Sequence, residues 1–307
     1  MVLLKRQAQI AAKVESTSGT AETSFIAANL IVNAFDPVFT NVWEQTERNQ
    51  LSGFGRFADM VGTRSATATF RVELTGDALG TAPAWAETLL PACGMKQTGD
   101  AFATVAEPVG SNLKTLTIAF YENGRQKVLS GAMGTFVLNG EAGKVLSIDF
   151  TFTGKYVSTA DVAMITQTQA DAPKPFRFAN AVMTMGSWAP CVATMGIDIG
   201  NAVILRECQA GADDSGYSAA LVTDRTTIIT VNPEAVLVAE NDTYAQALAG
   251  TETAFSCVLD DTVDIITIAA GAVAKVSPQS GDRNGVVTDD FTLKVLNDSF
   301  SITWSAS

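Results

Sequence analysis

The chain has 307 residues, of which 47% are hydrophobic and only 17% charged, so it can bury a substantial core and is not a disordered protein. Its formal net charge of −12 argues against binding to a nucleic-acid backbone, which requires a basic surface. The complete absence of His removes the commonest general base and metal ligand and makes a Ser-His-Asp triad impossible. We therefore expect no enzyme activity, no cofactor and no metal site.

Cysteines and apolar runs indicate a cytosolic protein. The four cysteines lie far apart and form no CxxC pair, which favours free thiols over a zinc site: Cys93, Cys191, Cys208 and Cys257. The N-terminus carries no apolar stretch long enough for a signal peptide. The longest apolar run, residues 265–274, is about half the length of a membrane span. We expect synthesis and folding in the cytosol, without membrane contact.

The N-terminal region predicts two contact elements. Residues 3–18 suit either a helix by propensity or an extended arm that pairs with a neighbouring subunit. A long loop is expected over residues 44–63, where basic and apolar side chains interrupt polar ones. Long loops with apolar residues usually dock on a partner, although such a loop can also fold back on its own domain.

Strict alternation of apolar and polar residues predicts strands in the first half. Residues 66–74 and 145–154 are the clearest, with Phe70 and Phe150 on their apolar faces. Further strands are expected at residues 115–121 and 133–138, and Asn123-Gly124 supplies a hairpin turn between them.

One helix is expected at residues 83–93. Pro83 suits its first turn and Gly94 the position after its end, while Trp85 packs on the sheet. Pro91 removes a helical hydrogen bond and is expected to shorten or kink the helix.

The second half repeats these elements. A polar linker is expected at residues 159–175, followed by an Arg-led strand at 226–231. Asp242 caps a helix over residues 243–249, which Gly250 closes. Strands at residues 254–259 and 263–268 flank Asp260-Asp261. This acidic pair, like Asp213-Asp214 and Asp289-Asp290, is not expected to act as an acid/base pair, because adjacent carboxylates point to opposite faces of a strand. A position in a turn or at a solvated edge is expected for each.

The repetition predicts a duplicated module. Arg48, Arg64 and Trp85 recur as Arg206, Arg225 and Tyr244, at a nearly constant separation along the chain (206 minus 48, 225 minus 64 and 244 minus 85). The separation is smaller at the hairpin turn (260 minus 123), because the first half has an extra stretch between Gly94 and Thr115. We predict module 1 at residues 1–158, with an N-terminal arm at 1–20, a linker at 159–175, and module 2 at 176–307. The alternative is that β-rich halves share this order by chance.

Several stretches together resemble the tail tube proteins of long-tailed bacteriophages. The stretches are LLKRQAQIAAKVES with Gly19-Thr20, TAPAW at 81–85 with Leu89-Leu90 and Ala92-Cys93-Gly94, residues 130–135, FTFTGKY at 150–156, Asp198-Ile199-Gly200-Asn201, and Thr223-Asp224-Arg225. The resemblance covers most of the chain. Pro91 departs from the family pattern, as does the lack of a proline after Tyr156.

The resemblance implies a mainly β fold: two tandem tail-tube-like β-sandwich domains that form a barrel, each with a short flanking helix. In such tubes, strands of neighbouring subunits join around a channel through which the genome passes, and loops and arms bridge stacked rings. Implied partners are other copies of the chain and the tape measure, tail terminator and distal tail proteins of the virion tail. Duplication predicts trimeric rings with pseudo-sixfold symmetry; a ring of six chains with module 2 outside is the competing arrangement.

The resemblance also assigns roles to side chains. Candidate inter-ring contacts lie on the loop at 44–63 and on its counterpart at 206–223: Arg48, Phe54, Arg56, Phe57, Met60, Arg206, Tyr217 and Leu221. Candidate lumen-facing residues lie on the polar strand faces: Thr67, Thr69, Arg71, Glu73, Ser147, Asp149, Thr151, Thr153, Thr230, Asp290, Thr292 and Lys294. DNA is expected to pass without specific binding.

Two other functions remain open. One is a related tube or ring component, such as a phage-derived secretion tube or a distal tail protein. The other is a soluble β-sandwich that binds carbohydrate on a Trp platform: Trp43, Trp85, Trp188 or Trp304.

Overall fold

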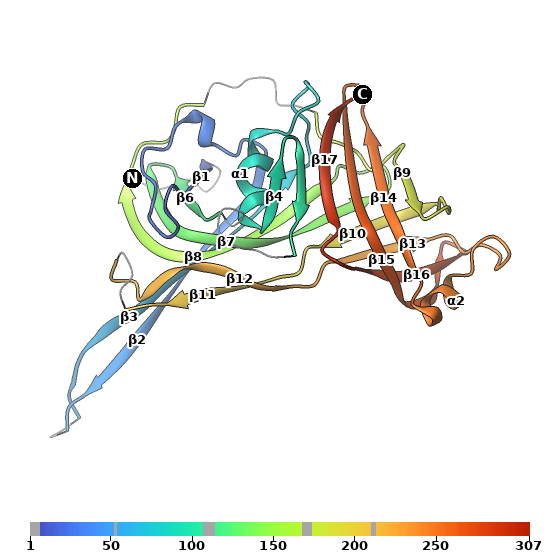
Figure 1. Ribbon diagram of the computed structural model, residues 1–307. Helices are drawn as coiled ribbons and strands as arrows, with labels where there is room; N and C mark the ends of the chain where they lie inside the picture. Colours follow the sequence, from blue (N-terminus) through green and yellow to red (C-terminus); the bar gives the residue numbers. More distant parts are fainter. Residues whose placement is uncertain (1–6, 52–53, 107–113, 168–173, 210–212) are drawn as a thin grey trace.

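The structure, a computed structural model, describes residues 7–51, 54–106, 114–167, 174–209 and 213–307 (Figure 1). Three parts of the predicted elements lie outside the described residues: positions 1–6 of the N-terminal arm, Ser52 and Gly53 of the long loop, and residues 168–173 of the linker.

The first half is built of strands around one short helix. The expected strands all fall within observed ones or overlap them closely, and the observed strands are longer at one or both ends. In chain order its elements are β1 (Ala8–Val14), the 3-10 turn η1 (Ala27–Asn29), β2 (Ala34–Asn49), β3 (Arg56–Glu73), α1 (Ala84–Ala92), β4 (Met95–Thr98), β5 (Ala101–Thr104), β6 (Leu116–Glu122), β7 (Arg125–Glu141) and β8 (Ser147–Asp161).

The second half has the same character. Asp242 caps α2 by accepting a hydrogen bond from the Ala245 amide, and Gly250 ends the helix at φ 62°, as expected. The elements are β9 (Val182–Met185), β10 (Val192–Asp198), β11 (Asn201–Glu207), β12 (Tyr217–Arg225), β13 (Ile228–Pro233), α2 (Thr243–Ala249), β14 (Glu252–Asp260), β15 (Asp264–Arg283), β16 (Val286–Val295) and β17 (Phe300–Ala306). The mainly β fold class is confirmed.

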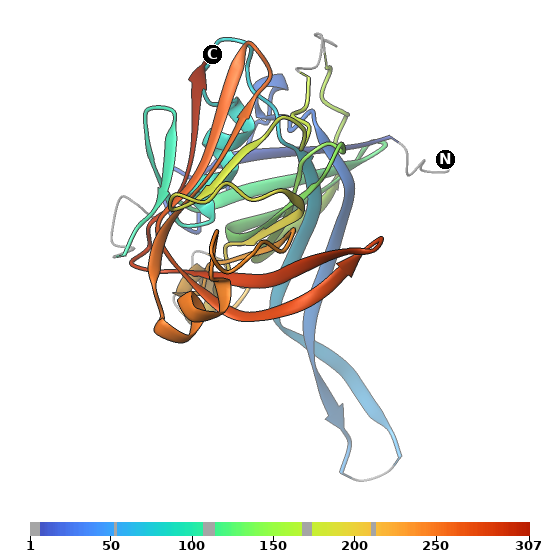
Figure 2. The same cartoon turned by 90° about the vertical axis from the view of Figure 1, so that its right-hand side faces the viewer.

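One large antiparallel sheet runs through both halves of the described chain (Figures 1 and 2). Its strand order is β2-β3-β8-β7-β10-β13-β16-β15-β17-β5-β4. The two halves pair where β7 meets β10, from Thr194 opposite Glu141 to Asp198 opposite Val137, and again where β5 meets β17. Because these contacts consist of backbone hydrogen bonds, the sheet crosses from one half to the other without a break.

The strands pair in the same order in both halves. In the first half β1-β6-β7-β8-β3 are neighbours, with β2 at the end; in the second half β9-β14-β15-β16-β13 are neighbours, with β10 next. The hairpin β4–β5 has no counterpart and accounts for part of the extra length after Gly94.

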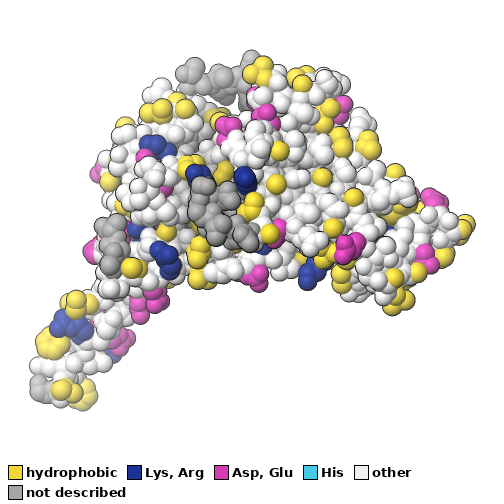
Figure 3. Space-filling view, viewed as in Figure 1, with side chains coloured by type: hydrophobic (Ala, Val, Ile, Leu, Met, Phe, Trp, Pro, Cys, Tyr) yellow, Lys and Arg dark blue, Asp and Glu magenta, His cyan; other side chains and the backbone are white. Residues whose placement is uncertain are grey.

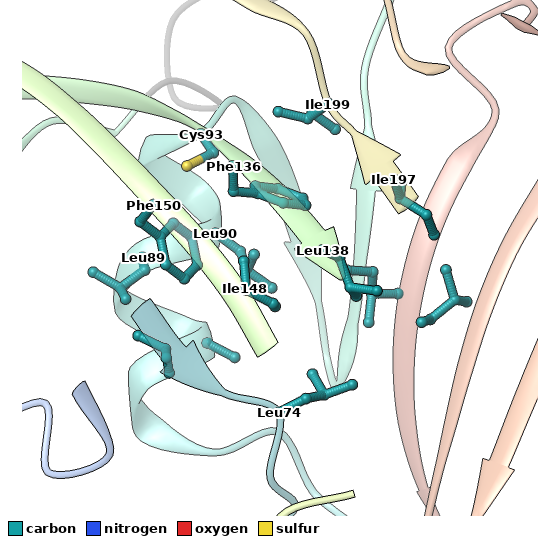
Figure 4. Packing of buried hydrophobic residues seen from close by; sticks show 14 of the residues in the cluster. Leu74, Leu89, Leu90, Cys93, Phe136, Leu138, Ile148, Phe150, Ile197 and Ile199 are labelled. Carbon is teal, nitrogen blue, oxygen red and sulfur yellow. The ribbon is translucent and has the colours of Figure 1, made fainter. Parts of the chain in front are cut away.

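A continuous apolar core lies on one face of the sheet. The helix α1 covers this face, with Leu89, Leu90 and Cys93 pointing toward Phe150 and Ile148 (Figure 4). The Trp85 indole donates a hydrogen bond of 3.0 Å to the Thr75 hydroxyl. Trp85 is therefore a core residue, as its position on the apolar helix face predicts.

Two predicted elements are different in the structure. Residues 44–63 are not a loop, because β2 extends to Asn49 and β3 begins at Arg56, and the two pair nearly to the tip. The 206–223 counterpart likewise contains strand, in the hairpin β11–β12. These segments lack the apolar alternation of a packed strand, so their sequence resembles a loop, but cross-strand hydrogen bonds satisfy the backbone without burial.

Smaller corrections concern segment ends. The helix α1 reaches Ala92, one residue past Pro91, and the Cys93 and Gly94 amides close its end by donating to the Leu90 and Pro91 carbonyls. The predicted linker begins within β8, which reaches Asp161. The N-terminal segment is extended rather than helical over Ala8–Val14, where β1 pairs with β6 of the same chain.

Candidate functional site

The predicted lumen residues of the first half form one polar surface. They are cross-strand neighbours on β3 and β8, in the pairs Thr67–Thr153, Thr69–Thr151, Arg71–Asp149 and Glu73–Ser147. Their side chains are exposed or half-buried, whereas the alternate residues of both strands are buried. Since α1 covers the buried face, this polar face lies on the opposite side of the sheet from the core.

Charges on this face are paired. The Arg71 Nε donates to Asp149 Oδ1 at 2.8 Å, and the Asn139 amide donates to the other Asp149 oxygen at 3.0 Å. The hydrogen bond to Asp149 raises the pKa of Arg71 above its ordinary value. Both partners are substantially exposed, so the pair contributes at most about 1 kcal/mol. The face is polar without being strongly basic.

The predicted residues of the second half occupy equivalent positions. Thr230 on β13 lies opposite Thr292 on β16, and Lys294 lies opposite Ile228. Asp290 is exposed opposite Gln279 of β15. The Thr230–Thr292 pair repeats the Thr69–Thr151 pair of the first half. The shift from the first threonine to its counterpart (230 minus 69) equals the shift between the two repeated arginines (225 minus 64).

The hairpin β2–β3 projects away from the body as an arm, defined here as residues 44–63 (Figures 1 and 2). Five candidate contact residues lie on it, and all are exposed: Arg48, Phe54, Arg56, Phe57 and Met60. Arg48 pairs across the hairpin with Phe57, and its guanidinium lies 5.4 Å from the ring centroid. Apolar and basic side chains gather on the arm in the space-filling view (Figure 3). Such exposed apolar clusters mark interaction surfaces.

The other three candidates, Arg206, Tyr217 and Leu221, lie on β11–β12 and not on the arm. This second hairpin packs on the body. Its residues Ala220 and Val222 bury against Met133 of β7, with Val203 and Leu205 beside them. Glu207 of β11 lies opposite Tyr217 of β12. The structure therefore separates the eight candidates into a free group and a group beside a docked surface.

Ionic contacts fix the tip of the second hairpin. The Lys155 ammonium is fully buried and donates to Asp213 Oδ2 at 2.8 Å and to the Gly19 carbonyl at 2.7 Å. Arg64 pairs with the neighbouring Asp214. Burial raises the pKa of Asp213, but hydrogen bonds from Lys155 and Ser215 outweigh burial and hold that pKa below its ordinary value.

Sequence reasoning missed the buried carboxylate of Glu15, which lies near Lys155. The Glu15 carboxylate accepts hydrogen bonds from the Gly19 and Gly131 amides and from the Thr115 and Thr117 hydroxyls, at 2.6 to 2.9 Å. It joins the N-terminal segment to β6 and β7. The available signal was Lys155 itself, a charge placed directly after the alternating strand 145–154, where a partner is required.

No catalytic arrangement is visible in the part of the chain that the structure describes. There, no group of three or more Cys, Asp or Glu side chains gathers to hold a metal ion. Desolvation raises the pKa of the buried Cys93 and Cys257 thiols, the latter to about 12, so neither is a reactive thiolate. Among these residues, no helix has the length and apolarity needed to cross a bilayer.

The Trp platforms of the carbohydrate-binding alternative are mostly unavailable. Trp85, Trp188 and Trp304 are buried, and the Trp304 indole donates to the Thr75 carbonyl at 3.1 Å. Trp43 remains partly exposed on β2, where it contacts Tyr156 edge to face.

Comparisons with known proteins point to one family. A family model described as phage tail tube protein matches residues 5–306, nearly the whole chain. A search of curated proteins finds no match to this sequence.

Proposed function

Because the chain belongs to the phage tail tube protein family, a family of structural virion proteins, we propose that it assembles into stacked rings that form the hollow tail tube. The observation that carries this proposal is the single sheet that crosses both halves of the chain, with the polar faces of β3–β8 and β13–β16 in equivalent positions. A long antiparallel sheet with two unclosed ends is an aggregation risk, and ring closure removes those ends.

We propose that three chains form each ring. Both halves follow one pairing order, and the β7–β10 junction joins them within one sheet, so each chain contributes two equivalent segments to the wall. Three chains then supply six segments with pseudo-sixfold symmetry. The competing ring of six chains would place the second half outside the wall, which agrees less well with the continuous sheet that joins it to the first half.

The polar sheet face is proposed to line the channel. It carries Thr and Ser hydroxyls and a paired Arg71–Asp149, with an overall chain charge of −12. Such a surface offers no unpaired basic stripe to retain phosphates, so DNA passes without specific binding. Replacing both Asp149 and Asp290 with Lys is expected to slow DNA ejection; unchanged ejection from particles of normal tail length would refute the lumen assignment.

The projecting arm is proposed to contact the next ring. Stacking head to tail is a heterologous contact that does not close, so it generates a tube of open length. The exposed apolar side chains of the arm suit this role because they become buried only on assembly. The tape measure, tail terminator and distal tail proteins are the expected partners at the tube interior and ends.

Negative-stain electron microscopy of the purified chain, with averaging of end-on views, tests the proposal. Hollow tubes or rings with threefold order and six lobes are the expected result. Compact monomers at high concentration, even with added tail-tip complexes as nucleators, would contradict it. Copy number in intact tails separates the tube protein from a distal ring component, because only the former is present in many stacked rings.

A further inference from the structure

Two unpaired strand edges lie at the ends of the run β2-β3-β8-β7-β10-β13-β16-β15. At one end, β2 pairs with β3 only, and its other edge has no strand partner among the described residues. At the other end, residues 276–283 of β15 pair with β16 only, beyond the segment that contacts β14 and β17. The two edges lie at opposite ends of this run (Figure 1). Each therefore exposes backbone donors and acceptors to a second chain.

The junction inside the chain supplies a template for joining these edges. There, β7 pairs antiparallel with β10, and Leu138 lies opposite Ile197. Both side chains are fully buried, so the junction also continues the core (Figure 4). By their pairing partners, β7 is the equivalent of β15, and β10 is the equivalent of β2.

The first equivalence, of β10 with β2, follows from register. Thr40 of β2 pairs with Thr67 of β3, and Asp198 of β10 pairs with Ile228 of β13. The shift from β2 to β10 (198 minus 40) is therefore nearly the same as the shift from β3 to β13 (228 minus 67). Asp198 is thus the counterpart of Thr40.

The second equivalence, of β15 with β7, follows in the same way. Val137 of β7 pairs with Asp149 of β8, and Gln279 of β15 pairs with Asp290 of β16. The shift from β7 to β15 (279 minus 137) is nearly the same as the shift from β8 to β16 (290 minus 149). The Val137–Asp198 pair of the template therefore translates to Gln279 opposite Thr40.

We infer that β15 of one copy pairs antiparallel with β2 of a second copy, with Gln279 opposite Thr40, Ser280 opposite Phe39 and Gly281 opposite Val38. This inference rests on the proposed tube assembly and specifies its subunit junction. Thr40 shares the polar face with Thr67, and Gln279 shares it with Asp290, so the pairing continues the polar surface across the junction.

Exposed apolar side chains near both edges also favour a second copy of this chain as the partner. Beside the β2 edge, Phe35 and Val38 are 45% and 54% exposed, and Phe39, the core-face counterpart of Ile197, lines a groove of about 790 Å³ with Ile10 and Phe120. Near the β15 edge, Val276, Val286 and Val287 are exposed. At the internal junction the equivalent region is filled, since Met195 and Ile197 belong to the buried core. The groove is thus the place where a second copy completes the core.

Disulfide trapping tests the register. The background replaces the accessible thiols, Cys191→Ser and Cys208→Ser, and keeps the two buried ones. The test variant adds Thr40→Cys and Gln279→Cys, both at exposed positions. Seven inter-strand steps of about 4.8 Å separate these strands within one chain, so a disulfide between them reports a contact between chains.

Oxidised assemblies of the test variant are expected to give a covalent ladder on non-reducing gels, ending at the number of chains in a ring. The control variant combines Thr40→Cys with Asp282→Cys, about 10 Å further along β15 and on its other face, and is expected to stay largely monomeric. Tubes visible by microscopy with no ladder, or with equal ladders in both variants, would overturn the register while leaving the tube function intact.

Hydrogen exchange on the unmodified chain is the second measurement, and it needs no substitution. Amides of residues 38–41 and 279–283 are expected to become protected together on assembly, because the matching segments of the internal junction, residues 137–141 and 194–198, are paired strand to strand within the chain. Tubes in which either segment exchanges at its monomer rate would overturn the inference. Failure of the unmodified chain to assemble under any condition would overturn the proposed function and, with it, this junction.

Discussion

The two long hairpins of this chain come from equivalent places in the two halves and behave differently. The arm, at the end of β2–β3, projects into solvent with Phe54, Phe57 and Met60 exposed. The hairpin β11–β12 instead lies on β7 and β8, where Met133, Ala220 and Val222 are buried. Arg64 and Lys155 hold its tip through Asp214 and Asp213.

The difference indicates what the arm lacks. The docked hairpin finds its receiving surface in the first half of the same chain. The first half's own hairpin has no preceding half to receive it within the monomer, so its apolar side chains stay exposed. A two-stranded ribbon alone is marginally stable in water, which makes a partner surface important to the arm. The docked hairpin therefore shows the kind of surface on which the arm would pack.

Two methionines give the largest expected contrast in stability. Met133 is 1% exposed beneath the docked hairpin, whereas Met60 is 60% exposed on the arm. Met133→Ala is expected to lower the free energy of unfolding by about 3 kcal/mol, because it leaves a cavity between β7 and β12. Met60→Ala is expected to change it by less than about 0.5 kcal/mol.

Urea denaturation followed by Trp fluorescence measures both variants. Equal effects on the free energy of unfolding would mean that the second hairpin contributes no more burial than the arm, and the comparison would fail.

The buried Lys155 provides the next contrast. Lys155→Met removes the donor to Asp213 and to the Gly19 carbonyl and leaves both acceptors without their partner. We expect a loss of about 2 kcal/mol, less than for a fully buried pair because Asp213 is 37% exposed. The matched control is Lys144→Met, whose ion pair with Glu141 is exposed on both sides and contributes less than about 0.5 kcal/mol.

Thermal and chemical unfolding of the two lysine variants measures the loss of unfolding free energy in each. A Lys155→Met protein as stable as Lys144→Met would show that the tip contacts do not hold the hairpin.

These contrasts bear on how far sequence alone could go. Alternation in residues 66–74 and 145–154 predicted the strands and their buried faces correctly, because a one-residue slip would expose Phe70 and Phe150. The polar faces followed from the same periodicity, and their members proved to be direct cross-strand neighbours. Local pattern was sufficient for these strands, whereas β10 and β17, which also bury one face, were not predicted.

The pattern failed where structure depends on distant partners. The arm was expected as a loop, because strands exposed on both faces carry no alternation. Glu15 and Lys155 gave no local sign of their partners, since Thr115, Gly131 and Asp213 lie far away in sequence.

The match of Tyr244 to Trp85 shows the same limit within the repeat. Trp85 is buried in the core, whereas Tyr244 is exposed on α2 and donates to Asp289. Spacing along the chain could align the two aromatic residues, but it could not show how each helix packs on its sheet. Tyr244 therefore occupies the helix position that matches Trp85, but it is not buried as Trp85 is.

The arm itself predicts a change in assembly without a change in stability. Phe57→Ser combined with Met60→Ser removes exposed apolar area that the proposed assembly buries between rings. We expect the concentration needed for tube formation to rise at least about tenfold, which corresponds to about 1.4 kcal/mol per contact. Unfolding free energy should stay within about 0.5 kcal/mol of the parent.

The control for the arm is Leu237→Ser, an apolar residue outside both hairpins that is even more exposed than Phe57 and Met60. Sedimentation against protein concentration measures assembly of each variant. Normal assembly of the arm variant would remove the arm from the inter-ring contact.

Acid gives the smallest and most local contrast between the two hairpins. The folded-state pKa of Asp213 lies below its ordinary value of 3.8, so its carboxylate stabilises the docked hairpin above that pH and the contribution disappears as pH falls through the folded-state pKa. Partial exposure limits the effect to less than about 1 kcal/mol. Amide exchange in residues 217–222 is therefore expected to accelerate, relative to β7 and β8, below about pH 3.8.

The arm serves as the internal reference, because none of its described carboxylates contacts Lys155. Asp213→Asn should remove the acid-dependent part of the exchange in residues 217–222 and leave the arm unchanged, since the amide cannot titrate. Other carboxylates with lowered pKa values, such as Glu22 and Glu122, pair with Lys13 and Arg125 and lie outside the docked hairpin. An acid response of residues 217–222 that survives in Asp213→Asn would therefore show that the Lys155–Asp213 pair is not its source. The buried ammonium would then hold the N-terminal segment through Gly19, not the hairpin.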